Sequence, residues 1–234
     1  MGGRGGASHR AAASGGFHQA ERLARQLQVR LDTASLIRAR ILPQYVMETL
    51  KGVKAIVDAF PVMKGKVSYL DANETRSSAY ASAGGDGGLH MGLYGRMTPE
   101  RLKETWEMCL RTGFHPEGTT SASIFVHEMG HQIEAYLNKR DYGNPWVWGK
   151  TADKVVWEGI QRVDPTVSGL HTKEAYQIAK SISGYAVDGY RASTKSWSTW
   201  ETLAEAVSDY YENEERAKPL SREIWSILRR ELNR

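Results

Sequence analysis

The sequence predicts an α+β fold, in which a small and mostly antiparallel sheet is followed by a helical C-terminal part. Apolar residues recur at helical spacing between residues 17 and 59. Short β-prone segments follow at residues 66–70, 78–82 and 89–94, separated by turn-forming residues such as the glycines within 84–88. Helical patterns then continue from residue 98 to residue 232. Strands that precede a run of helices are typical of an α+β arrangement.

The helices of the second part have recognisable starts and apolar sides. Thr98 and Pro99 form a typical N-cap and first helical residue, so we expect a helix from there to about residue 111, ended by Gly113. The helix expected over residues 121–137 has an apolar side made of Ile124, Phe125, Met129, Ile133 and Tyr136. Further helices are expected over residues 150–163, 172–183, 200–214 and 221–232.

Composition and charge divide the chain into three parts. Residues 1–16 are rich in Gly, Ala and Ser, and we expect a disordered linker there. Residues 17–60 are expected to form a basic helical arm, and residues 61–234 the main domain. The first 40 residues hold seven arginines and no lysine against Glu21 and Asp32, whereas the remaining residues are close to neutral. Such an arm could contact nucleic acid, an acidic partner or another subunit, or simply be a solvated surface.

Several classes of protein are excluded by composition. No apolar run approaches the roughly 18 residues of a membrane span, and the N-terminus lacks the apolar core of a secretory signal. Cys109 is the only cysteine of the chain, so neither an internal disulfide nor a cysteine-rich zinc cluster can form. Histidines and carboxylates are therefore the side chains left to hold a metal ion.

The sequence His-Glu-Met-Gly-His at residues 127–131 carries the most specific chemical signal. On a helix, His127 and His131 lie one turn apart on the same face and can bind one Zn²⁺. Glu128 lies beside them, where it can accept a proton from a zinc-bound water, whose pKa the metal lowers to about 7. The pattern predicts a catalytic zinc site with Glu128 as general base.

A third ligand must come from elsewhere in the chain. Glu134 and Leu137 exclude the metzincin continuation of the motif, which requires Gly and His at these positions. His171, Glu158 and Glu201 are the alternatives, and Glu201 is favoured. Glu205 follows Glu201 by one helical turn, beside small residues that allow close helix packing, and can accept a hydrogen bond from a ligating imidazole. The other interpretation is a solvated acidic stripe that Asp209 and Glu212 continue.

Three segments together resemble a known family: HPEGTTSASIFVHEMGHQIEAYL (115–137), ISGYA (182–186) and WETLAEAVSDYY (200–211). They are similar to the zincin domains of phage head-associated and mobile-element polyproteins and, more distantly, to the catalytic domain of anthrax lethal-factor-type toxins. The resemblance covers roughly residue 60 to the C-terminus. It implies a zincin-like fold and one zinc ion per chain, held by His127, His131 and Glu201, with Glu128 as base.

The resemblance also implies roles for other residues. Tyr185 would donate a hydrogen bond to the oxyanion of the tetrahedral intermediate. Tyr190 is the alternative, because the 14 residues between Ala186 and Glu201 exceed the family spacing. A substrate peptide would pair with an edge strand above the active-site helix, expected at Leu89, His90, Met91 and Gly92. The side chain of His90 is expected on the solvent face of that strand, and His115 is expected to anchor a loop against the motif helix.

The predicted function is that of a zinc-dependent endopeptidase of the gluzincin type, acting on a peptide or protein substrate. The alternative is a structural or assembly component of a phage or mobile element, joined to a virion partner by the N-terminal arm, with a vestigial or single-cut zincin domain. A third hypothesis is a cytoplasmic metallopeptidase that regulates a DNA-bound repressor. We expect a protein located in the host cytoplasm or in the virion, with export by an unconventional route as a further alternative.

Overall fold

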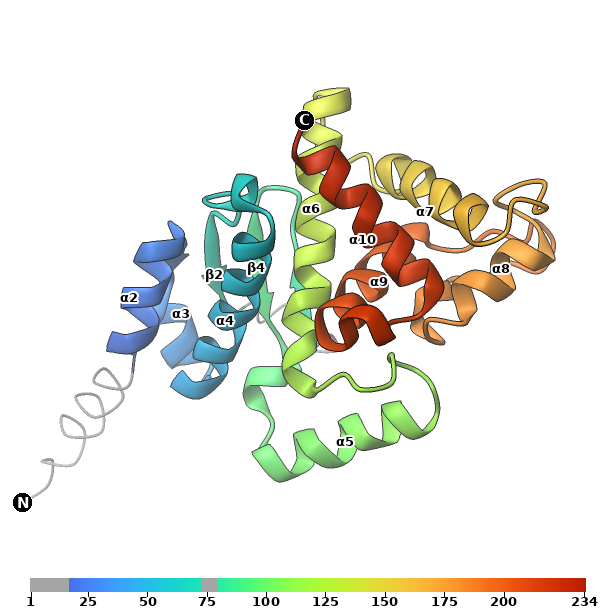
Figure 1. The fold of residues 1–234 in the computed structure, drawn as a ribbon. Helices are drawn as coiled ribbons and strands as arrows, with labels where there is room; N and C mark the ends of the chain where they lie inside the picture. Colours follow the sequence, from blue (N-terminus) through green and yellow to red (C-terminus); the bar gives the residue numbers. More distant parts are fainter. Residues whose placement is uncertain (1–16, 73–79) are drawn as a thin grey trace, which may run out of the picture.

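The computed structural model describes residues 17–72 and 80–234. The linker expected at residues 1–16 and the first part of the strand expected at 78–82 lie outside the described residues. Figure 1 shows the motif helix α6 (Ile124–Tyr142) running through the middle of the molecule. The sheet and the N-terminal helices lie on one side of α6, and the C-terminal helices lie on the other. The structure is therefore of the mixed α+β class.

The helices and strands have the following bounds. The N-terminal helices are α2 (His18–Leu27), α3 (Thr33–Arg38) and α4 (Pro43–Ala59). The strands are β1 (Arg30–Leu31), β2 (Tyr69–Asp71), β3 (Ala81–Ala83) and β4 (Gly88–Met91). The later helices are α5 (Pro99–Arg111), α6, α7 (Lys150–Val163), α8 (Lys173–Lys180), α9 (Thr199–Asn213) and α10 (Pro219–Leu232). Short 3-10 turns occur at Pro61–Met63, Leu93–Arg96, Ser121–Ser123, Tyr185–Val187 and Glu214–Arg216.

Helix α5 confirms the start and end that were predicted from the sequence. Thr98 is its N-cap and accepts a hydrogen bond from the backbone N–H of Arg101, and Pro99 occupies the first helical position. The helix ends at Arg111, just before Gly113, which has a positive φ of 67°. These signals act within one or two turns of the chain, and tertiary contacts do not override them here.

The sheet is mixed, and the expectation of a mostly antiparallel sheet was wrong. Its strand order is β1-β2-β4-β3, and only β3 and β4 pair in antiparallel fashion. The pairs β1–β2 and β2–β4 are parallel. Strand β1 has only two residues and lies in a segment that was expected to be wholly helical. Such a short strand leaves no alternating pattern in the sequence, so its parallel pairing could not be foreseen.

The edge strand was also assigned wrongly. Strand β4, which contains Leu89, His90 and Met91, lies between β2 and β3 and is paired on both sides. Gly92 follows it and donates its N–H to the carbonyl of Tyr80. The hairpin after β3 turns the chain back into the sheet, where Leu89 and Met91 are buried in the core. Within the described residues, β3 is therefore one edge strand of the sheet, and β1 is the other.

Residues 17–60 pack into the same core as the rest of the chain. Strand β1 pairs with β2, and α4 packs directly against α6. A Cβ atom on Gly52 of α4 would lie 3.2 Å from the Cβ of Phe125, so the two helices approach closely there. The apolar residues of these N-terminal elements belong to the one buried cluster that also contains those of α6 and α9. Residues 17–60 therefore contribute to the same core as the described residues that follow them.

Three polar side chains of α6 bind neighbouring elements. Gln132 donates hydrogen bonds of 3.0 Å to the carbonyls of Gly84 and Gly88, which flank the β3–β4 turn. Glu134 accepts a hydrogen bond from the backbone N–H of Gly149 at the start of α7. The helix dipole stabilises a negatively charged carboxylate at this position. Asn138 accepts hydrogen bonds from the backbone and hydroxyl of the α7 residue Thr151. Helix α6 therefore holds the sheet edge and the C-terminal helices in position.

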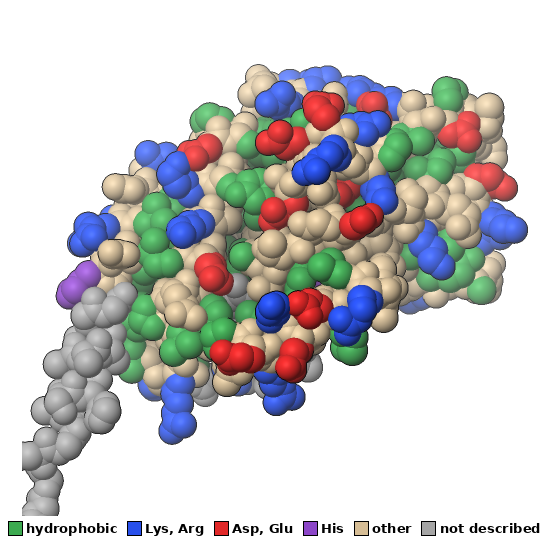
Figure 2. All heavy atoms as spheres, turned by 60° about the horizontal axis from the view of Figure 1, so that its bottom comes forward, with side chains coloured by type: hydrophobic (Ala, Val, Ile, Leu, Met, Phe, Trp, Pro, Cys, Tyr) green, Lys and Arg blue, Asp and Glu red, His purple; other side chains and the backbone are tan. Residues whose placement is uncertain are grey.

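The surface of the described residues carries charges of both signs. Figure 2 shows acidic and basic side chains interspersed on one face of the molecule, without a large area of one sign. No helix in the described part of the chain is long and apolar enough to cross a membrane.

Gly130 of α6 lies close against Ala204 of α9. A Cβ on Gly130 would lie 2.6 Å from the Cα of Ala204, a distance that forces the backbones apart. Gly130→Ala should therefore lower the free energy of unfolding by about 1–3 kcal/mol, despite the better helix propensity of alanine. Gly169→Ala is the matched control, because the nearest atom to its added Cβ is 3.9 Å away. Equal stabilities of the two variants in urea denaturation would contradict the contact.

Candidate metal centre

The structure brings His127, His131 and Glu201 together. One ligand atom from each lies within 4.8 Å of the others. The Oε2 atom of Glu201 is 3.2 Å from Nε2 of His127 and 3.4 Å from Nε2 of His131. Helix α6 supplies both imidazoles from consecutive turns, and the first turn of α9 supplies the carboxylate. Three side chains from two helices thus point at one place.

The arrangement fits a metal ion. Ligand atoms placed tetrahedrally at about 2.0–2.1 Å from a zinc ion lie about 3.4 Å apart, which is close to both measured distances. The Oε2 atom of Glu201 is buried and has no hydrogen-bond partner among the described residues. A buried carboxylate oxygen without a partner is costly, and a cation between it and the two imidazoles would compensate it. This His-His-Glu group can therefore hold a metal ion.

Glu205 orients His127 from behind. Its Oε1 atom accepts a hydrogen bond of 2.8 Å from Nδ1 of His127, and this assigns the ring proton to Nδ1. The lone pair of Nε2 is then directed at the metal position. The same carboxylate also contacts Nδ1 of His115 at 3.3 Å and accepts a 2.7 Å hydrogen bond from the hydroxyl of Ser183. Glu205 is therefore buried, ionised and fully hydrogen bonded.

Burial and charge shift the pKa values of these groups in opposite directions. Burial alone would raise the pKa of Glu205, but hydrogen bonds and the charges of His115 and His127 lower it to about 2. The pKa of Glu201 is also well below its usual range, because His127 and His131 outweigh the effect of burial. Burial opposes protonation of His127, yet the two carboxylates raise its pKa. The centre is thus an anionic site that favours a cation.

Glu128 lies beside the cluster in a cleft of about 390 Å³. It is 6% exposed, and burial is the main reason why its pKa lies above the usual value. The cleft is lined by β3, the motif residues, Trp148, Tyr185, Trp200 and Glu201. Edge strand β3 therefore runs along the cleft that contains the candidate base and the metal position.

Tyr185 lies in this cleft and Tyr190 does not. The ring of Tyr185 stacks on that of His127, with ring centroids 5.5 Å apart. Burial, together with the charges of Glu201 and Glu128, raises its pKa, so its hydroxyl remains protonated and can donate. Tyr190 is 41% exposed and packs on Tyr176 with centroids 4.2 Å apart. Of the two tyrosines, only Tyr185 lines the cleft.

The sequence analysis did not predict the roles of several residues around the metal position. Ser183 lies in the ISGYA segment, but only the fold shows that its hydroxyl reaches Glu205. His115 was expected only to anchor a loop; it does pack against Trp106, and it also contacts Glu205. Trp148 and Trp200 line the cleft without any sequence pattern that would have singled them out. These contacts join segments far apart in the chain.

The other candidates for the third ligand lie elsewhere. Glu158 forms a bidentate ion pair with Arg230, with N–O distances of 2.6 and 2.7 Å, and a further one with Arg162. His171 is exposed and faces the ring of Trp197.

The side chain of His90 is only 15% exposed, so the expectation that it lies on the solvent face of its strand was wrong. Its Nδ1 atom lies 2.6 Å from the carboxylate of Asp71.

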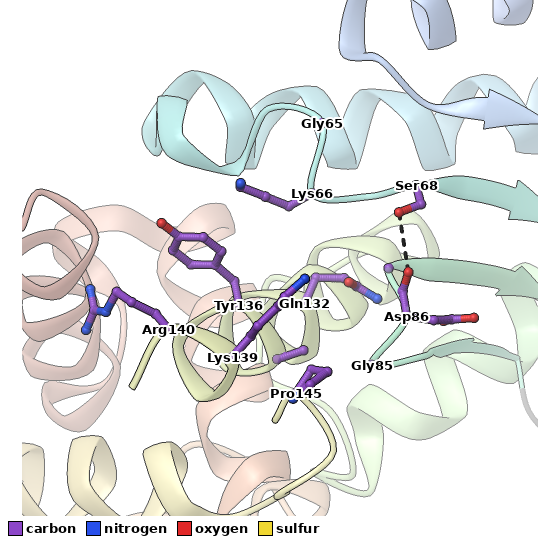
Figure 3. A pocket seen from close by; sticks show the side chains of 12 residues that line it. Gly65, Lys66, Ser68, Gly85, Asp86, Gln132, Tyr136, Lys139, Arg140 and Pro145 are labelled. Atoms are coloured by element: carbon purple, nitrogen blue, oxygen red, sulfur yellow. Dashed lines mark hydrogen bonds between the residues drawn. The ribbon is translucent and has the colours of Figure 1, made fainter. Parts of the chain in front are cut away.

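A larger pocket of about 480 Å³ has a different character (Figure 3). Lys66 enters it from the loop before β2, Tyr136 and Lys139 from α6, and Asp86 from the β3–β4 turn. Lys66 lies over the ring of Tyr136, and Asp86 already accepts hydrogen bonds from Tyr69 and Gly88. With no histidine and one paired carboxylate in its lining, this pocket does not have the ligands of a metal centre.

Removal of Glu201 should weaken metal binding most. Loss of a residue that orients a ligand costs about 10–100-fold in metal affinity, so Glu205→Ala should fall in that range and Glu201→Ala should exceed it. Glu158→Ala is the matched control, because its carboxylate binds arginines instead. Isothermal titration of the metal-free proteins with Zn²⁺ measures the zinc affinity of all three variants. If Glu158→Ala weakens binding more than Glu201→Ala does, the assignment of the third ligand is wrong.

Comparisons of the chain with protein-family models, with curated proteins and with solved structures found no match.

Proposed function

We propose that the protein is a zinc-dependent endopeptidase. The observation that carries this proposal is the convergence of His127, His131 and Glu201 beside a buried Glu128, in a cleft bordered by β3, an edge strand of the sheet within residues 17–72 and 80–234. The motif resemblance to phage-type zincin domains agrees with this arrangement. Two imidazoles and one carboxylate are a typical ligand set of catalytic zinc, which keeps its fourth position for water or substrate.

The zinc ion would supply Lewis acidity, which polarises a carbonyl group and makes a water molecule more acidic. The protein residues then have separate tasks. Glu128 would accept the proton of the attacking water and transfer it to the leaving amine. Its raised pKa suits both steps, because a base with a pKa nearer to neutrality also returns the proton readily.

The edge of β3 supports a peptide as the substrate. Across the hairpin, the N–H of Gly92 donates a hydrogen bond to the carbonyl of Tyr80, and the N–H of Gly84 donates one to the carbonyl of Gly88. Hydrogen-bonded and non-bonded pairs alternate in an antiparallel ladder, so the N–H and C=O groups of Ala81 and Ala83 point away from β4. These groups would pair with the main chain of an extended peptide, as in other cases of strand addition. Main-chain recognition within an open cleft favours cleavage inside a chain.

Tyr185 would stabilise the oxyanion that forms when water adds to the scissile carbonyl. Its phenol is protonated, and its ring is held against His127. The backbone N–H of Tyr185 also bonds to the carbonyl of Phe114, so the residue is fixed at two points. A donor held in place before the reaction costs no reorganisation in the transition state.

Glu128→Gln should abolish proton transfer while leaving the metal in place. The expected loss is about 10²–10⁴-fold in kcat, because Gln is of similar size but cannot act as a base. Cleavage of a denatured protein mixture, with zinc content measured on the same sample, tests this. Undiminished cleavage by the zinc-loaded variant would overturn the mechanism. A parent protein that binds zinc but cleaves nothing would favour the alternative of a structural component.

Tyr185→Phe should lower kcat by about 100-fold with little change in KM, because the hydroxyl would act mainly on the transition state. Tyr190→Phe serves as the control, since that ring lies on Tyr176 outside the cleft. Steady-state kinetics on one cleaved peptide would compare the two variants. Greater sensitivity at Tyr190 than at Tyr185 would reverse the assignment.

A further inference from the structure

The pocket of about 480 Å³ shown in Figure 3 carries an excess of positive charge. Its charged lining consists of Lys66, Lys139 and Arg140 against Asp86. None of the residues that line it also lines the catalytic cleft, so it is a separate cavity in the described part of the chain. We call this cavity the basic pocket.

Two cationic groups of the basic pocket have no anionic partner. Among the residues that the structure describes, the ammonium groups of Lys66 and Lys139 form no ion pair and no hydrogen bond. That of Lys66 lies over the ring of Tyr136, 5.1 Å from its centroid. The guanidinium of Arg140, in contrast, is paired with two neighbouring carboxylates. Both lysine side chains are exposed, so their charges are available to a ligand.

The walls of the basic pocket come from elements that are tied to one another. Tyr136 and Lys139 are three residues apart on α6, and Gln132 lies one turn earlier, so the three share one side of the helix. Gln132 donates hydrogen bonds to both ends of the β3–β4 turn. Figure 3 shows Lys66 on the loop before β2, across the pocket from α6. The two unpaired ammonium groups therefore border one space from separate elements.

The β3–β4 turn adds a backbone donor. Gly87 donates its N–H to the carbonyl of Gly84 at 3.0 Å, which closes the turn, and Gly87 has a positive φ of 86°. The N–H of Gly85, inside this turn, makes no hydrogen bond to any described residue. Gly85 lines the basic pocket, and free N–H groups of turns typically bind anions. The pocket therefore offers a neutral donor in addition to its lysines.

The one anionic side chain in the lining of the pocket already has partners. The Oδ2 atom of Asp86 accepts a 2.8 Å hydrogen bond from the hydroxyl of Tyr69, and Oδ1 accepts one of 3.1 Å from the N–H of Gly88. Figure 3 shows this carboxylate turned away from Tyr136 and Lys66. The negative charge therefore lies at one end of the pocket, apart from the unpaired ammonium groups.

We propose that the basic pocket binds the phosphate group of a small molecule. A phosphate carries a charge of about −1.5 to −2 at neutral pH and several acceptor oxygens. One such group can accept hydrogen bonds from both ammonium groups and from the N–H of Gly85. A carboxylate has one charge and two oxygens, and would leave part of this donor set without a partner. The ligand is therefore of the phosphate class.

The volume of the basic pocket leaves room for an organic part of the ligand. Small-molecule sites typically have volumes of about 300–1,000 Å³, and the pocket lies within this range. Free phosphate and a phosphorylated organic compound present the same group to the lysines. The binding does not depend on the proposed peptidase function, because the pocket shares no lining residue with the cleft.

Isothermal titration of the metal-free full-length protein with inorganic phosphate and with glucose 6-phosphate tests the proposal. The metal is left out so that phosphate cannot bind to it. Tighter binding of glucose 6-phosphate would identify an organic phosphate as the ligand, and equal binding would identify the phosphate group alone. Glucuronate, which carries a carboxylate in place of the phosphate, should bind more weakly than glucose 6-phosphate. Binding of neither phosphate, or equal binding of glucuronate, would overturn the proposal.

Variants of the lysines locate the site. Lys66→Ala and Lys139→Ala should each weaken phosphate binding about 10-fold, because each removes a charged hydrogen-bond donor. Lys64→Ala is the matched control: Lys64 is exposed, lies two residues before Lys66 and does not line the pocket. Its effect should stay within about twofold, because salt screens a charge outside the site. Equal effects of the three variants would overturn the proposal.

Amide chemical shifts give a second measurement on the unmodified protein. Titration of the ¹⁵N-labelled, metal-free chain with glucose 6-phosphate should shift the N–H resonance of Gly85 more than those of residues outside the basic pocket. Shifts centred instead on His127 and His131 would place the phosphate at the empty metal position, and would overturn the assignment to the basic pocket.

Discussion

The close approach of α6 and α9 at Gly130 and Ala204 is the constraint on which the metal centre depends. A Cβ on Gly130 would lie 2.6 Å from the Cα of Ala204, so the two backbones nearly touch. At this separation the carboxylate of Glu201 lies within 3.4 Å of the imidazoles of both His127 and His131. A wider separation would leave the carboxylate short of them, because a glutamate extends only a few ångströms from its backbone.

A metal ligand must also be held in one orientation, which close packing of two helices does not ensure. The buried carboxylate of Glu205 orients the ligand His127. It accepts hydrogen bonds from His127 and Ser183 and contacts His115, three residues that lie on different segments. A buried charge is tolerated only when its hydrogen-bonding capacity is met, so these partners stabilise the carboxylate as much as it orients them. The packing of the loop before α6 is thereby coupled to the orientation of a metal ligand.

The cleft is assembled from parts that α6 holds together. Gln132 donates hydrogen bonds to both ends of the β3–β4 turn and so holds β3 along the motif residues. On the other side, α5 and its following loop form the wall that contains Trp106, Cys109 and Phe114. The loop is tied to the Tyr185 segment by backbone hydrogen bonds from Gly184 to Gly113 and from Tyr185 to Phe114. Strand β3, the candidate base Glu128 and this apolar wall therefore lie next to one another around the metal position.

The local features of this protein follow from the order of its residues. Thr98 and Pro99 start α5 as predicted, and the i, i+4 spacings of His127 with His131 and of Glu201 with Glu205 place these pairs on single helix faces. Each of these depends on contacts within one or two turns, which the order of residues specifies. Tertiary structure alone decided the strand order, which moved the edge from residues 89–92 to β3, and the partners of Glu205. It also decided that Tyr185, and not Tyr190, lines the cleft. The partners of Glu205, for example, lie 22, 78 and 90 positions away from it along the chain, and no local periodicity indicates which distant segments will meet.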